Sequence, residues 1–166
     1  RDIHCTVITE ELVQRIKKLG ILPTIFGPYV YDHGDKLIPA FGEDRLERMF
    51  AAKSFLDAGV VIAAHSDHPC APYPPLMAIH GLVNRRTKSG YQIGQTQKVS
   101  VLDALKLYTI NAAYQQFDEK ILGSIEEGKL ADFVVLGEDI LTVPTEKIKD
   151  IPIEMTIIDG DIVYRT

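Results

Sequence analysis

Apolar residues in the first part of the chain recur at helical spacing twice, and each time a short apolar run follows. The first helix is expected between Thr9, which can cap it, and Gly20, which stops it, and residues 21–26 follow as a strand. Helical spacing returns over residues 46–56 and leads into the apolar run at residues 60–64. Short helices that alternate with almost wholly apolar strands are typical of parallel sheets covered on both faces, so this part is predicted to be α/β.

The segments around these two units carry weaker patterns. Residues 27–42 mix glycine, proline, tyrosine and charge without a clear period, which predicts a long loop that covers a site. Pro74 and Pro75 can start a helix that runs through Arg86, and another helix is expected after Ser100, which forms a capping box with Asp103.

The last quarter of the chain has a β pattern. Residues 130–136 are predicted as a strand, and residues 156–164 as two strands joined by an Asp-Gly turn. We therefore divide the chain into an α/β part, residues 1–122, and a β-rich part, residues 123–166.

Composition and charge narrow the range of partners. The chain has 166 residues, of which 46% are hydrophobic, and this suits one or two small globular units with a buried core. Its formal net charge is -5, with acidic and basic residues interspersed, so no nucleic-acid partner is expected. The longest apolar runs are far shorter than the roughly 20 residues that span a bilayer, so no membrane association is expected.

Two features bear on the origin of the chain. Arg1 stands where an initiator methionine would, and residues 1–6 lack the apolar core of a secretory signal, so the start is interpreted as an internal point of a longer protein. Cys5 and Cys70 form neither a CxxC pair nor a disulfide framework, which suits a cytoplasmic protein.

Candidate chemistry gathers directly after the second apolar strand. Residues 60–64 run into the sequence HSDHP at residues 65–69, just beyond the carboxyl end of a buried strand, where parallel α/β folds place their ligands. Asp67 can bind a metal ion or take a proton there. A turn residue whose side chain hydrogen-bonds its own backbone is the plain alternative for Asp67.

His4 and Asp67 are spaced as equivalent positions of a barrel would be. A (β/α)8 barrel of about 250 residues uses about 31 residues for each unit and about 62 for two, which matches the separation of these residues. Both are then expected at strand ends two strands apart, on the face where such barrels do chemistry. A hydrogen-bonded structural role is the alternative for a lone histidine such as His4.

Three motifs, taken in order, resemble one family. They are SDHP at residues 66–69, YTINAA at residues 108–113 and GSIEEGKLAD at residues 123–132. This set is similar to the amidohydrolase superfamily, and within it to the YtcJ-like branch of metal-dependent hydrolases that includes N-substituted formamide deformylases. The resemblance implies the C-terminal portion of a TIM-like (β/α)8 barrel, strands six to eight, in residues 1–122. Strands of a small β-sandwich would follow in residues 123–166.

The resemblance also implies roles for two residues. His4 resembles the metal-binding histidine of strand six, and Asp67 resembles the strand-eight aspartate that binds metal and acts as the general base. The HxH pair and the other ligands of the family would lie before Arg1. A divalent metal ion such as zinc is therefore expected in the complete protein and not in this chain alone, because catalytic zinc needs three protein ligands.

Three more residues are expected near the substrate. His65 and His68 could contact substrate or supply further ligands, with a hydrogen-bonded loop histidine as the alternative. Arg86 resembles an arginine that would clamp a substrate carboxylate, with a solvated helix end as the alternative. Gly27-Pro28 departs from the Gln-Pro that relatives often carry after strand seven, which leaves the substrate open.

Two functions from different classes follow. The leading hypothesis is that the complete protein hydrolyses a C–N bond of a small amide or N-formyl substrate with metal-activated water, while this chain alone is inactive. The alternative is a non-catalytic regulatory or interaction module that keeps the fold. A homo-oligomer is expected, because open sheet edges and uncovered apolar surface favour self-association.

Overall fold

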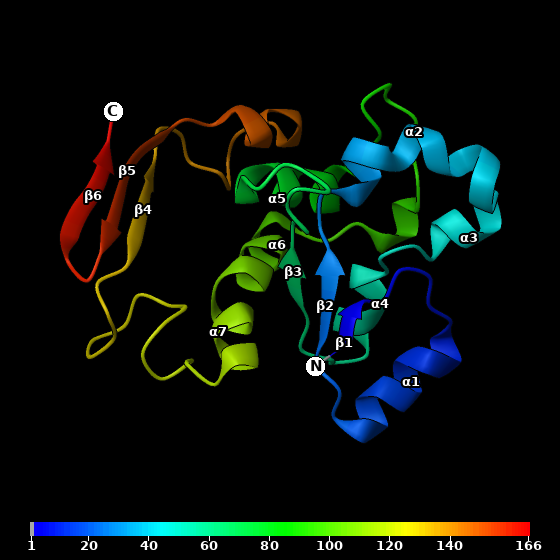
Figure 1. Cartoon of the computed structure of the whole chain (residues 1–166), viewed down its shortest axis with the longest axis horizontal. Helices are drawn as coiled ribbons and strands as arrows, with labels where there is room; N and C mark the ends of the chain where they lie inside the picture. The colour runs from blue at the N-terminus through cyan, green and yellow to red at the C-terminus, as the bar shows by residue number, and fades with distance from the viewer. Residues whose placement is uncertain (1) are drawn as a thin grey trace.

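The computed structural model describes residues 2–166, which form two three-stranded sheets and the helices around them (Figure 1). The first sheet is parallel, with strand order β1-β2-β3. Its strands are β1 (Asp2–His4), β2 (Pro23–Phe26) and β3 (Ala63–His65). The α/β class predicted from the apolar runs is confirmed.

Helix α1 (Glu10–Leu19) lies where the sequence predicts it. Thr9 Oγ1 accepts a hydrogen bond at 3.3 Å from a backbone amide of the first turn, and Gly20 ends the helix at a φ of 64°. Val13 and Ile16 are buried on the inner face of the helix. Both predicted end signals therefore operate, and the chain passes directly into β2.

Helix α2 (Tyr29–Phe41) replaces the long loop predicted for residues 27–42, so that prediction is wrong. The buried stripe of the helix consists of Val30, Gly34 and Leu37, a helical spacing whose middle member is a glycine. A Cβ on Gly34 would lie 2.5 Å from a threonine side chain, so the glycine marks a point of very close packing. Glycine has no apolar side chain, so the helical spacing of apolar residues does not reveal that this position is buried.

The single helix predicted over residues 46–56 is broken in two. Its parts are α3 (Glu43–Glu47) and α4 (Ala52–Asp57). Between them, the buried guanidinium of Arg85 donates hydrogen bonds to the carbonyl oxygens of Met49 at 2.8 Å and Phe50 at 3.4 Å. The Met49 carbonyl accepts from Arg85, and the Phe50 carbonyl also accepts from the Ala52 amide at 2.8 Å. Phe50 has a φ of 47°, so the backbone leaves the helical conformation between α3 and α4.

Helices after β3 complete the α/β part. They are α5 (Pro75–Asn84), the short 3-10 helix η1 (Gln95–Gln97), α6 (Val101–Tyr108) and α7 (Ile110–Gln116). Ser100 Oγ accepts from the Asp103 amide at 3.0 Å, which confirms the serine cap of the predicted capping box. The Asp103 carboxylate accepts from the Ser100 hydroxyl at 2.7 Å. Figure 1 shows α2 and α5 beyond the arrowheads of β2 and β3, with α6 and α7 beside β3. No helix in residues 2–166 combines the length and apolar character needed to cross a membrane.

The second sheet is antiparallel, with strand order β4-β5-β6. Its strands are β4 (Phe133–Leu136), β5 (Ile153–Ile158) and β6 (Asp161–Arg165). Asp159 and Gly160 join the last two strands with φ values of 51° and 85°, so the predicted hairpin turn is confirmed. Strands β4, β5 and β6 form one layer of sheet. The second layer that a β-sandwich requires stays a prediction.

A 3-10 helix, η2 (Thr145–Asp150), fastens the C-terminal part to α5. Asn84 Nδ2 donates to the Thr145 carbonyl at 2.8 Å, and Thr145 Oγ1 donates to Asn84 Oδ1 at 2.7 Å. Ile148 is fully buried in the same core as the α/β part. The division near residue 122 therefore does not separate two cores, and as a domain boundary it stays a prediction.

Candidate active site

The carboxyl ends of β1 and β3 lie at the same edge of the parallel sheet. His4 is the last residue of β1 and is in register with Ile25, while Phe26 is in register with His65, the last residue of β3. Asp67 follows two residues later. His4 Nε2 lies 3.9 Å from Asp67 Oδ2, and each side chain is 42% exposed. The prediction that the two residues lie together at one end of the sheet is confirmed, and we call them the His4–Asp67 pair.

Unusual backbone conformations direct both members of the pair. The φ values are 80° at His4 and 52° at Asp67, in the left-handed region that few residues other than glycine adopt. Such a conformation costs on the order of 1–3 kcal/mol, and residues held in it cluster at functional sites. The strand end and the following turn thereby bring an imidazole and a carboxylate to one accessible place.

His65 lies beside the pair and has an unused ring nitrogen. Its ring centroid is 5.0 Å from that of His4 and 5.3 Å from that of Phe26. Nε2 of His65 is buried and has no hydrogen-bond partner among residues 2–166. Burial lowers the pKa of His65 below its ordinary value, and the neighbouring His4 lowers it further. The ring is therefore neutral at neutral pH, with Nε2 able to bind a metal ion or a ligand group.

His68 and Arg86 lie in other surroundings. His68 is exposed and packs edge-on against Tyr73, with ring centroids 5.6 Å apart. Arg86 is exposed and pairs with Gln92 in an isolated β-bridge. Across the described part of the chain, no hydrogen bond, ion pair or ring contact joins either side chain to the His4–Asp67 pair. Their substrate-binding roles stay predictions.

The donor atoms at this edge of the sheet are of the types that bind a divalent metal ion. Proteins bind zinc through imidazole nitrogen and carboxylate oxygen, and catalytic sites use three protein ligands plus water. The His4–Asp67 pair supplies one donor of each kind, and the unpartnered Nε2 of His65 is a further nitrogen nearby. No group of three or more His, Cys, Asp and Glu side chains within residues 2–166 is arranged to hold a metal ion. The residues present thus match such an ion in donor chemistry and supply part of its coordination.

A cluster of rings that the sequence did not indicate lies next to this edge. Phe26 packs against Tyr29 with ring centroids 4.7 Å apart, and Tyr29 packs against His33 at 4.8 Å. Tyr29 and His33 belong to α2, in the segment predicted to be a loop. Their spacing of four residues directly after a strand end is the signal that could have revealed them, because residues four apart are neighbours on a helix.

Close packing accounts for Gly27, where the resemblance leads one to expect glutamine. A Cβ at this position would lie 2.8 Å from Tyr108 Oη and 3.0 Å from Ala78 Cβ. A longer side chain does not fit unless α5 and α6 move. Burial raises the pKa of Tyr108 far above its ordinary value, and its hydroxyl has no hydrogen-bond partner within residues 2–166.

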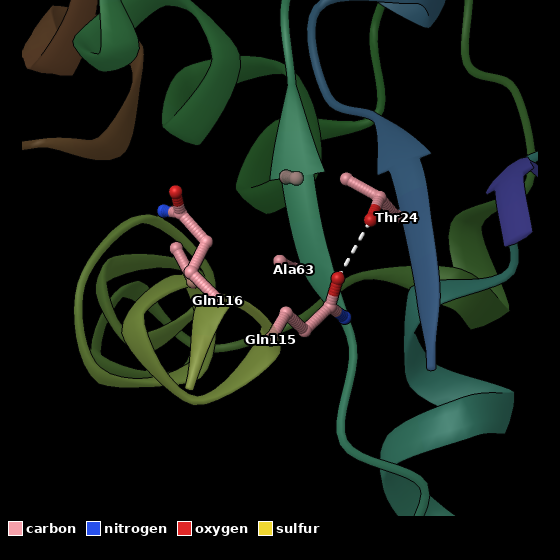
Figure 2. Close-up of a pocket in the computed structure, with 6 residues that line it drawn as sticks. Thr24, Ala63, Gln115 and Gln116 are labelled. Atoms are coloured by element: carbon pink, nitrogen blue, oxygen red, sulfur yellow. Dashed lines mark hydrogen bonds between the residues drawn. The ribbon is translucent and has the colours of Figure 1, made fainter. Parts of the chain in front are cut away.

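A cavity of about 230 Å³ lies between α7 and the strands β2 and β3 (Figure 2). Thr24 and Ala63 line it from the strands, and Gln115 and Gln116 line it from α7. Thr24 Oγ1 donates a hydrogen bond to Gln115 Oε1 at 2.7 Å, as Figure 2 shows. The lining contains no ionisable side chain, so the cavity offers no group for acid-base or metal chemistry. The residues that can do chemistry gather at the carboxyl edge of the sheet.

Residues 1–164 match the family described as Amidohydrolase family, and the chain belongs to this family. Within it, the chain is YtcJ-like. It is 32% identical to the YtcJ protein of Bacillus subtilis (strain 168) over 167 residues, which cover 99% of this chain and 32% of that protein. It is 35% identical to the N-substituted formamide deformylase of Arthrobacter pascens over 152 residues, which cover 91% of this chain and 28% of that protein. The chain thus spans about a third of the length of these curated relatives.

Solved structures share the fold of the chain. An uncharacterized metal-dependent hydrolase from Pyrococcus horikoshii OT3 superposes with a TM-score of 0.75 at 22% identity, over 86% of this chain and 29% of that one. An adenosine deaminase from Xanthomonas campestris with bound Zn gives a TM-score of 0.68 at 16% identity, over 96% of this chain and 36% of that one. At these identities the likeness concerns the fold and does not extend to a substrate.

Proposed function

We propose that the protein to which this chain belongs hydrolyses a C–N bond in an amide or N-formyl group. The observation that carries the proposal is the His4–Asp67 pair, an imidazole nitrogen and a carboxylate oxygen 3.9 Å apart at the carboxyl edge of a parallel sheet. Membership of the amidohydrolase family and the deformylase among its relatives support the type of bond. Because the chain supplies only part of a metal site, we propose that it is inactive alone.

In this proposal, His4 and Asp67 hold a divalent metal ion, and zinc is the first candidate because a solved structure of this fold contains it. Such an ion, when bound, lowers the pKa of water towards about 7 and polarises a carbonyl group. The Asp67 carboxylate accepts a proton from the attacking water and passes it to the leaving nitrogen, first as general base and then as general acid. Its exposure of 42% leaves access for water and substrate.

Neighbouring side chains fit roles in substrate binding. Neutral His65 offers its buried Nε2 to a polar group of the substrate, and an unmet hydrogen bond at a buried atom is relieved when a ligand supplies the partner. His68 and Arg86 are exposed and would contact the outer part of the substrate. A planar guanidinium at Arg86 suits a substrate carboxylate, which it can bind through two parallel hydrogen bonds.

We also propose that the protein is cytoplasmic and that it self-associates. Cys5 and Cys70 are free thiols, which suits a reducing compartment. Large apolar side chains of the second sheet are exposed, among them Ile158, Ile162 and Val163. Exposed apolar surface and unpaired strand edges favour association with another chain. Light scattering of the 166-residue chain should therefore detect oligomers, and a clean monomer over a broad concentration range would contradict this expectation.

Asp67→Asn in the complete protein tests the hydrolytic proposal directly. Without the carboxylate, turnover of an amide or formamide substrate should fall by about 10²–10⁴-fold, the usual contribution of a general base. Asp57→Asn is the matched control, because Asp57 is an exposed carboxylate that pairs with Lys53 in α4. Bound metal is measured in the same samples. Normal turnover and normal metal content in Asp67→Asn would overturn the proposal.

A non-catalytic regulatory or interaction module on the same fold is the rival proposal. The incomplete set of metal donors within residues 2–166 favours it. On this view the complete protein binds no metal ion, and Asp67→Asn leaves its binding partners unchanged. Metal analysis of the complete protein separates the two proposals.

A further inference from the structure

The turn that carries Asp67 has few attachments to the rest of the molecule. Residues 67–70 are exposed, and the Cys70 amide closes the turn by donating to the Asp67 carbonyl at 2.7 Å. Among the hydrogen bonds of residues 2–166, one joins this turn to another element of the fold. It runs from His33 Nε2 in α2 to the Cys70 carbonyl oxygen, at 2.9 Å. Besides the His4–Asp67 pair itself, the His33 hydrogen bond is therefore the polar contact within residues 2–166 that ties the turn to another element.

The His33 ring is itself held in a defined place. It packs on Tyr29 with ring centroids 4.8 Å apart and lies edge-on to Phe26 at 6.5 Å. A carbonyl oxygen can only accept a hydrogen bond, so Nε2 of His33 must carry the hydrogen. Asp32 Oδ2 lies 3.4 Å from the same nitrogen, and the Asp32 carboxylate also pairs with Lys88. Asp32 Oδ2 is a second acceptor near this hydrogen, but the Cys70 carbonyl at 2.9 Å is the nearer one, and ring packing holds His33 in place.

We propose that His33 is a positioning residue for Asp67. His33 fixes the Cys70 carbonyl, the Cys70 amide fixes the Asp67 carbonyl, and the turn so held directs the Asp67 carboxylate to His4. Asp67 has a φ of 52°, a conformation that persists only where its surroundings enforce it. The role rests on the proposed function of Asp67 as metal ligand and general base.

Four variants separate the hydrogen bond from the packing of α2. H33F keeps a ring against Tyr29, and H33M keeps an unbranched apolar side chain, but both lack the donor. H33Q places a side-chain N–H near the position of Nε2 and should restore the bond. D35N is the control, because Asp35 lies on the same helix and accepts a hydrogen bond from the Ser89 amide at 3.3 Å, away from the turn.

The first measurement uses the 166-residue chain and needs no activity. Amide hydrogen exchange at Cys70, followed by NMR, should become about threefold to tenfold faster in H33F and H33M, the effect of one lost hydrogen bond. H33Q should exchange close to the parental rate, and D35N at that rate. Circular dichroism checks that each variant folds. Because two variants lack the donor, the test can still be made if one of them does not fold. Unchanged exchange at Cys70 in the donor-free variants would overturn the positioning role.

The second measurement uses the complete protein with an amide or formamide substrate. In H33F and H33M, kcat should fall about 10- to 100-fold with little change in KM, as for other groups that orient metal-binding residues, and H33Q should recover most of it. D67N is assayed in parallel. If D67N loses activity while H33F and H33M keep kcat, the positioning role is overturned and the proposed function stands. If D67N keeps full activity, both are overturned.

Discussion

Arg85 is a buried cation that holds distant parts of the chain together through backbone carbonyls. It is 1% exposed, and burial lowers its pKa to about 10. Within residues 2–166 it forms no ion pair with a carboxylate within 4.0 Å. Its guanidinium donates four hydrogen bonds, of 3.1, 3.2, 3.4 and 2.8 Å, to the carbonyl oxygens of Ile93, Gly94, Phe50 and Met49 respectively.

Arg85→Met keeps most of the side-chain stem and removes these donors. Two of the four carbonyls keep a partner, because the Phe50 oxygen also accepts from the Ala52 amide at 2.8 Å and the Gly94 oxygen from the Gln97 amide at 2.9 Å. The Met49 and Ile93 carbonyls lose their Arg85 donor. A buried carbonyl left without a partner costs about 1–3 kcal/mol, so these two would cost about 2–6 kcal/mol. Removal of a buried cation also relieves its desolvation cost, which offsets part of that loss. We therefore expect the free energy of unfolding to fall by about 1–4 kcal/mol, a sizeable share of the stability of a small domain.

Urea denaturation of the 166-residue chain, extrapolated linearly to water, measures this change. Arg86→Met is the matched control, because Arg86 is the next residue and is exposed, so its loss should change stability by less than about 0.5 kcal/mol. A loss below about 1 kcal/mol in Arg85→Met would refute the reasoning. Equal losses in the two variants would refute it as well.

Three further predictions concern packing, pH and helix capping. Gly27→Ala should lower the free energy of unfolding by about 1–3 kcal/mol, because its Cβ would meet Tyr108 Oη at 2.8 Å. Adding Tyr108→Phe should restore part of this loss in the same urea assay, and no recovery would argue against the contact. Burial lowers the pKa of His80 below its ordinary value of 6.5, so the unfolded chain binds the proton first as the pH falls. Stability should then be full above about pH 6.5 and decline below it, and urea titrations over a pH series should show a shallower decline for His80→Gln; an unaltered slope would exclude His80 as the cause. Thr9→Ala should cost about 1 kcal/mol and Thr9→Ser should restore it, and equal thermal stability of all three proteins would contradict the cap.

The elements whose ends are marked by local contacts could be predicted from the sequence. Thr9 and Gly20 bound α1, and the Ser100 hydroxyl caps α6 through an amide three residues away. The Asp159-Gly160 turn likewise needs only two residues that tolerate positive φ. Each signal acts within a few residues and requires no knowledge of the rest of the fold, so the sequence is sufficient to predict it.

The errors in the predicted fold come from contacts between distant segments. Gly34 lies in the buried stripe of α2, where the side chain of Thr87 leaves no room for a Cβ, so the apolar period that would predict this helix is interrupted. At the break between α3 and α4, the Met49 carbonyl accepts a hydrogen bond from Arg85, which lies 36 residues later. Hydrophobic periodicity contains no information on either contact.

The sequence is sufficient to predict which residues meet at the candidate site, but not how their side chains are directed. The spacing of His4 and Asp67 is sufficient to predict their proximity, because parallel strands in register bring their carboxyl ends to one edge. The direction of the Asp67 carboxylate depends on its own positive φ and on a hydrogen bond from His33, 37 residues away from Cys70. Neither leaves a periodic trace in the sequence. A substitution at His33 would thus preserve every motif that marks the family and still displace the proposed base, so in this chain the motifs predict the fold more securely than they predict the working geometry of the site.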